Sequence, residues 1–460
     1  MQNYVLTSFF AVLLFSLSGA AIDIDWTGKY RLEGTDVRNY DLDKNEKNYF
    51  LHHLILNPSI IATDDLEINF RFDIANSADY GGFTNQVGQF LGNTASAETS
   101  TNINSQTSDQ IAQTMGLETI ANTLLYLNWH TEYGSIAGGR LPKQFGLGTV
   151  YSAGKGSFDH WLDTHDVVSL QMLAGNHTIT PSYGKINEGL TNERDDTTIT
   201  SLQYDYEYPE TKLKISILWE VINSDDSVAT DFTGTTGSSI SGSYSMENKL
   251  LYFSRAYGDW DLALEFAQQD GDTGIFVGAQ EISMSGTGLA IEAGYKLSPN
   301  LKFEGRFGYA SGDDINTTDK YEGFQFDRNY DVALLLFNHR LGTTDFLKTE
   351  SIGGSTTGGV DTEYISNAIY LAPKLVYQTS DKWTFDTSLI YATLHDGVLD
   401  SSVSKDLGLE IDFGMSYFHN PQTELRAEFG YLFAGEAFAG NTSQPTTNSY
   451  IISTKAAISF

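Results

Sequence analysis

The sequence predicts an all-β chain that closes into a single antiparallel barrel of about 18 strands, with 16 strands as the alternative. Two observations predict this fold. Apolar residues recur at every second position along most of the chain, and short turns alternate with long polar loops. Successive side chains of a β-strand point to opposite faces, so each such segment has one apolar face and one polar face.

The clearest strands lie at the C-terminal end of the chain. Every odd position from Leu407 to Tyr417 is apolar, and after a turn at 419–422 the alternation resumes in Leu425–Phe433. A third strand ends the chain at Phe460. In a soluble sandwich the apolar faces would be buried, whereas in a membrane barrel they would meet lipid and the polar faces would line a lumen.

Earlier segments with the same alternation precede these three strands. They are Asp25–Gly34, Tyr49–Ala62, Leu66–Ile74, Ile120–His130, Ser135–Leu141, Asp166–Ala174, His177–Gly184, Leu202–Tyr208, Leu213–Trp219, Lys249–Ala256, Trp260–Phe266, Leu289–Leu297, Leu301–Tyr309, Ile369–Tyr377 and Trp383–Tyr391. The weakest are Asp25–Gly34 and Ser135–Leu141, and 16 strands would remain without them.

The connections between these segments differ in length in a regular way. Short turns centre on Asp64, Tyr133, Asn176, Pro209, Gly258, Pro299, Asp381 and Pro421. Long polar loops occupy Thr35–Glu46, Asn76–Glu118, Pro142–His165, Asn187–Asp196, Asn223–Ser245, Asp270–Ser283, Ser311–Tyr364, His395–Asp406 and Ala434–Thr447. Short turns on one side and long loops on the other are typical of outer-membrane barrels, whose long loops lie outside the cell.

Trp and Tyr residues lie near the ends of the segments, with aliphatic residues between them. Their flat apolar rings carry one polar group, which favours the interface between lipid and water. Two such aromatic girdles enclose the apolar band of a membrane barrel. We assign to the girdles Trp129, Tyr208, Trp260, Tyr295, Tyr309, Tyr377, Trp383, Tyr391, Tyr417 and Tyr450.

The composition of the chain excludes several classes of protein. The 460 residues include no Cys, which removes disulfides, thiolate nucleophiles and Cys-ligated zinc. A net charge of −32 argues against a nucleic-acid partner, because phosphate binding needs basic surfaces. A mean hydropathy of −0.25, without a long apolar run after residue 20, excludes a bundle of membrane-spanning helices.

Residues 1–21 have the pattern of a secretory signal peptide. Tyr4–Leu17 is almost entirely apolar, and the small residues that follow favour cleavage after Ala20 or Ala21. The first three residues contain no Lys or Arg, which departs from the usual pattern. The alternative is an uncleaved membrane anchor, which needs a longer apolar run of about 20 residues. We therefore expect the barrel to comprise residues 22–460.

Three short motifs suggest a family. They are Gly139-Arg140-Leu141-Pro142 with Phe145-Gly146, Trp161 and Asp166; the stretch Gly308–Asp314; and the terminal Phe460. With these motifs the chain resembles outer-membrane barrels of the alginate-export type and, more broadly, large porins of gram-negative bacteria. The resemblance implies an outer-membrane location and a loop after Arg140 that folds into the lumen. It also implies that Phe460 is a signal read by the outer-membrane insertion machinery.

The parity of the strands predicts a lumen wall of mixed charge. We assign to the pore lining Arg71, Arg140, Lys143, Lys214, Arg306, Glu304, Glu410, Asp412, Arg426 and Glu428. A channel that exports a polyanion needs a mainly basic wall. The resemblance therefore supports the fold better than it supports an alginate-like substrate.

Three loops are long enough to enter the lumen, namely Asn76–Glu118, Pro142–His165 and Ser311–Tyr364. The last contains Val332–Phe337, an apolar run that favours a position inside the barrel or packed under its rim, with an extra hairpin above the membrane as the alternative. At the narrowest zone we expect Arg140 and Lys143, together with Arg71, Arg306 and Arg426 from the wall.

Porin-like passive passage of small polar solutes is the function that these features favour. One alternative is a dedicated channel for polysaccharide export or uptake, and another is a non-conducting barrel that acts as a scaffold or adhesin. The expected partners are outer-membrane lipid, the insertion machinery and a small polar solute or oligosaccharide. We expect no enzyme activity and no catalytic residue, because the acidic residues and His at 159–166 lack a nucleophile elbow. We also expect no cofactor and no metal site, because Glu46 and His52 depart from the pattern of a calcium loop that Asp41, Asp43 and Asn45 begin.

Overall fold

The structure is a computed structural model that describes residues 23–40, 42, 44–74, 120–187, 196–224, 244–277, 280–314, 316–317, 319–339, 341, 364–397, 404–439 and 446–460. The expected signal peptide at 1–21 and the loop Asn76–Glu118 lie outside these residues. Within the described ranges, the chain contains no helix of the length and hydropathy that crossing a membrane requires.

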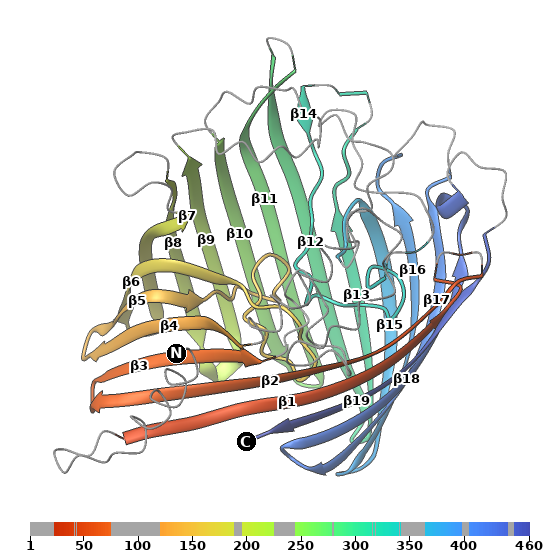
Figure 1. Cartoon of the computed structure of the whole chain (residues 1–460), viewed down its shortest axis with the longest axis horizontal. Coiled ribbons are helices and arrows are strands. Elements are labelled where there is room, and N and C mark those ends of the chain that lie inside the picture. Colours follow the sequence, from red (N-terminus) through yellow and green to blue (C-terminus); the bar gives the residue numbers. More distant parts are fainter. Residues whose placement is uncertain are drawn as a thin grey trace, which may run out of the picture.

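Eighteen β-strands close into one antiparallel barrel, as the sequence predicts (Figure 1). They are β1 (Asp23–Arg38), β2 (Glu46–Thr63), β3 (Leu66–Ile74), β4 (Ile120–Thr131), β5 (Gly134–Pro142), β6 (Thr164–Ala174), β7 (His177–Asn187), β8 (Thr197–Tyr208), β9 (Leu213–Ser224), β10 (Tyr244–Tyr257), β11 (Trp260–Val277), β12 (Gln280–Ser298), β13 (Leu301–Ala310), β15 (Ala368–Ser380), β16 (Trp383–Leu394), β17 (Asp406–Asn420), β18 (Thr423–Ala434) and β19 (Ser449–Ser459). The two-residue strand β14 (Lys320–Tyr321) pairs with β12 outside the ring, because β13 pairs directly with β15.

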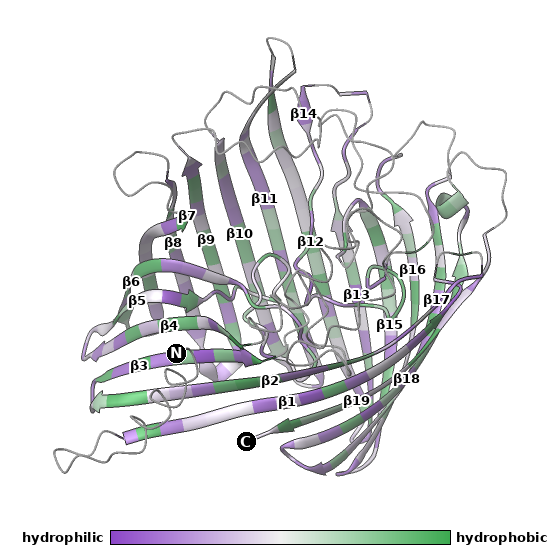
Figure 2. Ribbon diagram, viewed as in Figure 1, coloured by the Kyte–Doolittle hydropathy of each residue, from purple (hydrophilic) through white to green (hydrophobic). Residues whose placement is uncertain are grey.

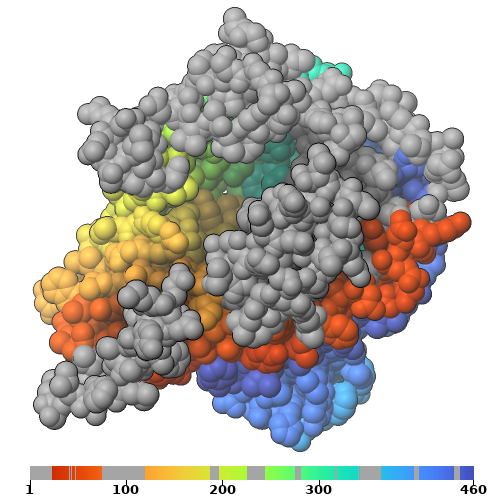
Figure 3. Space-filling model, viewed as in Figure 1, coloured from red at the N-terminus to blue at the C-terminus, as the bar shows by residue number. Residues whose placement is uncertain are grey.

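The first and last strands close the barrel. Strands β1 and β19 pair in antiparallel register from Lys29 opposite Ser459 to Arg38 opposite Tyr450. Figure 3 shows the red N-terminal strands lying against the blue C-terminal strands. The backbone N–H of Gly28 donates to the carbonyl of Phe460 at 2.8 Å, so both ends of the described chain lie at the short-turn end of the barrel.

All the short turns predicted from the sequence join consecutive strands in the structure. The predicted loop Asp270–Ser283 is wrong, because β11 continues to Val277 and β12 begins at Gln280. These two strands rise above the rest of the wall (Figure 1). Polar residues and Gly dominate residues 268–274 and 280–288, so this part of the sequence has no sustained apolar alternation that would mark a strand.

The apolar face of the strands is the outer face of the barrel, as predicted. Phe413, Leu425 and Ile452 are about half exposed there, whereas Glu410 and Glu265 on the opposite face are fully buried. Figure 2 shows the alternation of hydrophobic and hydrophilic residues along the strands. An apolar surface around a charged interior is the reverse of a soluble protein and matches a barrel surrounded by lipid.

The residues assigned to the aromatic girdles all lie at outer-face positions of the strand register. Two pairs contact each other in a tilted arrangement across neighbouring strands beside short turns. The ring centroids of Trp260 and Tyr295 lie 4.4 Å apart, and those of Trp383 and Tyr417 lie 4.8 Å apart. Contact of these rings with the lipid interface stays a prediction.

Candidate functional site

Two of the loops predicted to enter the lumen fold into it. We call residues 143–163 the first inward loop and the described part of 311–341 the second inward loop. Phe145 of the first loop is 1% exposed, and Leu335 and Leu336 of the second are 0% and 1% exposed. The prediction that Val332–Phe337 lies inside the barrel is therefore confirmed.

The first inward loop is held by Glu265, which projects from β11 into the barrel. The Glu265 carboxylate accepts the backbone N–H of Leu147 at 2.6 Å and further hydrogen bonds from the adjoining turn. Gly146 begins this turn with φ +47°, and a Cβ there would lie 2.5 Å from Glu265 Oε2. Glycine alone allows the backbone to take this conformation so close to the carboxylate.

A second wall carboxylate, Glu220 of β9, binds the same loop at its start and near its middle. The Tyr151 hydroxyl donates to Glu220, and Lys143 Nζ lies 3.7 Å from the Glu220 carboxylate. Burial lowers the pKa of Lys143, partly offset by the charge of Glu220. Lys143 therefore lies buried under the loop, where Glu220 pairs with its charge, and its place at the constriction stays a prediction.

The second inward loop is held by two neighbouring carboxylates of β17. Glu410 accepts the backbone N–H groups of Leu334, Leu335 and Leu336 at 2.9, 2.7 and 2.8 Å. Asp412 accepts the N–H of Leu334 as well, at 3.2 Å. Hydrogen bonds to a carboxylate are about twice as strong as those between neutral groups. Glu410 and Asp412, both predicted to line the pore, therefore anchor the loop.

A network of ion pairs runs across the wall from β15 to β19. The carboxylate of Asp386 lies 3.1 Å from Lys374 and 2.9 Å from Arg426, and Arg426 lies 2.6 Å from Glu428. Lys455 extends the network, at 2.9 Å from Glu428. Alternating charges of this kind link neighbouring strands and leave the wall nearly neutral.

The network continues into the first three strands, where it is buried. Asp73 accepts hydrogen bonds from His53 at 2.6 Å and from both Nε and Nη2 of Arg71 at 2.9 Å. Arg31 and Glu33 of β1 form a further buried pair at 3.0 Å. Arg71, predicted to line the pore, is paired with Asp73 and is only 7% exposed.

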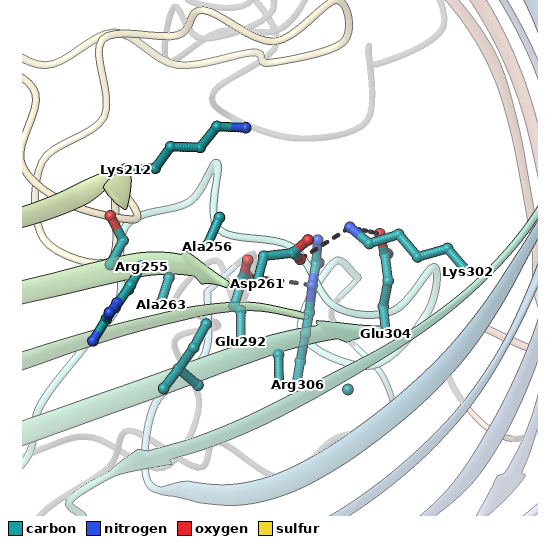
Figure 4. A pocket seen from close by; sticks show the side chains of 13 residues that line it. Lys212, Arg255, Ala256, Asp261, Ala263, Glu292, Lys302, Glu304 and Arg306 are labelled. Carbon is teal, nitrogen blue, oxygen red and sulfur yellow. Dashed lines mark ion pairs between the residues drawn. The ribbon is translucent and has the colours of Figure 1, made fainter. Parts of the chain in front are cut away.

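The open part of the lumen wall lies near the short turns. A hollow of about 270 Å³ is lined by Lys212, Asp261, Glu292, Lys302, Glu304 and Arg306, among others (Figure 4). Lys302 lies 3.1 Å from Asp261 and 3.0 Å from Glu304, and Arg306 lies 3.3 Å from Glu292. Lys214 is also partly exposed near this end, at 2.7 Å from Glu207. Cations and anions therefore alternate along the lining of this hollow.

Arg140 requires a correction, because the sequence places it in the lumen and the structure places it on the outer face. Its neighbours in register are Leu125 of β4, which is 44% exposed on the outer face, and Asp166 of β6. Arg140 Nε donates to Asp166 at 2.7 Å. The next residue, Leu141, packs inside the barrel against a cluster that includes Val167.

This placement predicts different effects for two arginines on ion selectivity. Arg306→Ala should raise the permeability ratio of cations to anions by roughly fivefold, because a unit charge at about 4 Å is worth about 1 kcal/mol in water. Arg140→Ala should leave the ratio unchanged. Reversal potentials in a salt gradient measure both, and a shift caused by Arg140→Ala would contradict the outward placement.

Sequence reasoning missed the residue that joins the two inward loops, Asn329. Its amide oxygen accepts the N–H groups of His160 and Trp161 at 3.1 and 3.0 Å. Its amide nitrogen donates to Ser152 Oγ at 3.1 Å and to the Trp161 carbonyl at 2.9 Å. Only the turn-forming composition of Asp327-Arg328-Asn329 marks this position in the sequence.

No family model and no curated protein matches the sequence. Among solved structures, a BenF-like porin from Pseudomonas fluorescens is 11% identical, with a TM-score of 0.51 over 95% of this chain and 98% of that one. OccK2 (OpdF) of Pseudomonas aeruginosa is 9% identical, with a TM-score of 0.51 over 95% and 98% of the two chains. OccK5 (OpdH) of the same species is 11% identical, with a TM-score of 0.50 over 95% and 98%. The chain has the barrel fold of gram-negative outer-membrane proteins, as the sequence predicts.

Proposed function

We propose that the chain is a porin-like channel through which small polar solutes cross the outer membrane passively. The observation that carries the proposal is the partly open hollow of paired charges inside an 18-stranded barrel (Figure 4). Side chains cannot fill a barrel of this strand number, so its interior is an aqueous or plugged lumen. The mature chain would begin near residue 22, and Phe460 would be read by the insertion machinery.

The alternation of charge favours weak selectivity. In the hollow, Lys302 is bracketed by Asp261 and Glu304, and Arg306 lies beside Glu292. An alginate-export channel would need cations free to meet a polyanion along its path. The paired wall therefore favours small solutes over a dedicated polysaccharide.

The inward loops support a second candidate, a barrel without a conducting pore that serves as a scaffold or adhesin. Purified protein in planar bilayers distinguishes the candidates. A steady, weakly selective conductance is expected for the channel. Block by a charged oligosaccharide at low concentration would favour the polysaccharide channel instead. No conductance from protein that retains its β-barrel circular dichroism and heat-dependent gel mobility would overturn the proposal in favour of the scaffold.

A further inference from the structure

The two inward loops meet at a contact that we call the loop junction, formed by Ser152, Trp161, Asp163, Asp327 and Asn329. Besides the four hydrogen bonds of Asn329, the backbone N–H of Asp327 donates to the Thr149 carbonyl at 2.7 Å. The guanidinium of Arg328 stacks over the ring of Trp161 at 4.3 Å from its centroid. The loops therefore form one unit in the lumen.

Two carboxyl groups face each other within the loop junction. Asp163 accepts the backbone N–H of Ser152 at 2.8 Å, and Asp327 accepts the N–H of Asn329 at 2.9 Å. Both carboxyl groups lie at the contact between Ser152 and Asn329, close enough to act on each other. Two carboxyl groups this close can share a hydrogen bond only when one of them carries a proton.

We propose that Asp163 and Asp327 form a proton-dependent switch that joins the inward loops when the pair holds a proton and lets them separate when it does not. Loop separation would widen the lumen. The switch would therefore make the bore of the barrel respond to the pH of the surrounding medium.

Charged neighbours of the pair are already engaged elsewhere. Lys143 pairs with Glu220, and Glu265 binds the turn at Leu147. Other titratable groups around the junction are Tyr151, His160, His165 and Arg328. Burial lowers the pKa of His160, which favours its neutral form. Among the described residues, no cation lies within ion-pair distance of either Asp163 or Asp327 to stabilise them once both are ionised.

The direction of the pH response follows from the same geometry. Burial, with the charge of Asp163 beside it, raises the pKa of Asp327 from 3.8 to about 8. The contribution of the bound proton to joining the loops is therefore fully present below about pH 4. It is progressively lost as the pH rises to about 8. Linkage to one proton changes the ratio of separated to joined loops by up to about tenfold per pH unit in this window.

Spin labels test the switch without relying on conduction. The chain has no Cys, so Lys155→Cys and Gln325→Cys, both at exposed positions, place one label on each inward loop. The distance between the labels should lengthen when the pH is raised from about 5 to about 8.5, a range that covers most of the window. Asp327→Asn and Asp163→Asn, which keep a hydrogen-bonding group without its charge, should hold the short distance at both values. Asp314→Asn, in the same loop, should behave as the parent protein.

A second variant and a second measurement make the outcome decisive. Asn329→Leu removes the four amide hydrogen bonds and should give the long distance at every pH. Bilayer conductance should rise with pH in the parent protein and stay constant in Asp327→Asn. Unlike the label distance, this measurement rests on the proposed channel function. A distance that is independent of pH, or that changes equally in the parent and Asp327→Asn, would overturn the switch whether or not the barrel conducts.

Discussion

Replacing Glu410 by Gln should release the second inward loop and raise the single-channel conductance. The carboxylate accepts three consecutive backbone N–H groups and is fully buried. Each hydrogen bond to a charged group contributes about 1.5–3 kcal/mol. A Gln side chain offers a single weaker acceptor and brings an NH₂ group toward N–H donors, so several kcal/mol of anchoring should be lost.

Glu207→Gln is the matched control for this prediction. Glu207 also projects from the inner face of the wall, but 58% of its side chain is exposed and it holds only Lys214. Its replacement removes the same charge without freeing a loop, so the conductance should change little. Equal increases in both variants would mean that charge, rather than anchoring of the loop, sets the conductance.

Replacing Asp73 by Ala should produce the largest loss of stability among single substitutions in the wall. Asp73 is 1% exposed and accepts hydrogen bonds from His53, Arg71 and Thr123. Its removal leaves the buried Arg71 guanidinium without its acceptor. Breaking a buried ion pair from one side costs about 3–5 kcal/mol. Thermal unfolding in detergent, followed by heat-dependent gel mobility, measures the effect.

Asp261→Ala provides the comparison, because it breaks an ion pair on the same inner face where water reaches. The Asp261 side chain is 48% exposed and lies 3.1 Å from Lys302. Exposed ion pairs contribute between zero and about 1 kcal/mol. The unfolding temperature should therefore stay close to that of the parent. Similar losses in Asp73→Ala and Asp261→Ala would contradict the burial that distinguishes the two pairs.

The architecture could be predicted because lipid imposes a simple pattern on every strand. Residues 407–417 alternate without a fault, and β17 has the predicted parity, with Phe413 outward and Glu410 inward. The pattern is incomplete in the upper part of β11 and β12, where polar residues and Gly dominate. The sequence therefore predicts that both strands end early, although β11 continues to Val277 and β12 begins at Gln280.

For Arg140 a motif led to the wrong face of the strand, although the alternation of side chains along the strand indicates the correct one. Ile136, Gly138 and Arg140 occupy alternate positions of one strand, so they share a face, and Ile136 lies opposite the outward-facing Trp129. The prediction followed the Gly-Arg pair of the resemblance instead. The strand continues without a shift in register through Gly139, so the pair does not turn the Arg140 side chain inward.

The roles of the inner carboxylates could not be predicted from the sequence. Glu304 and Glu410 have the same residue type and parity, yet Glu304 faces the hollow and Glu410 is covered by a loop. Backbone N–H groups from a loop distant in sequence make this difference, and such groups leave no signature in residue type. The loop junction at Asn329 escaped detection for the same reason.

The pairing of β1 with β19 has a consequence for how the chain reaches its folded state. Every other neighbouring pair in the ring joins strands that follow one another in sequence, but this pair joins the two ends of the chain. Bringing distant segments together is entropically slow. Until it happens, each terminal strand presents unpaired N–H and C=O groups that hydrocarbon cannot satisfy. Closure should therefore be the last and committing step of membrane insertion, and a chain truncated before β19 should fail to assemble stably even though most of its strands are complete.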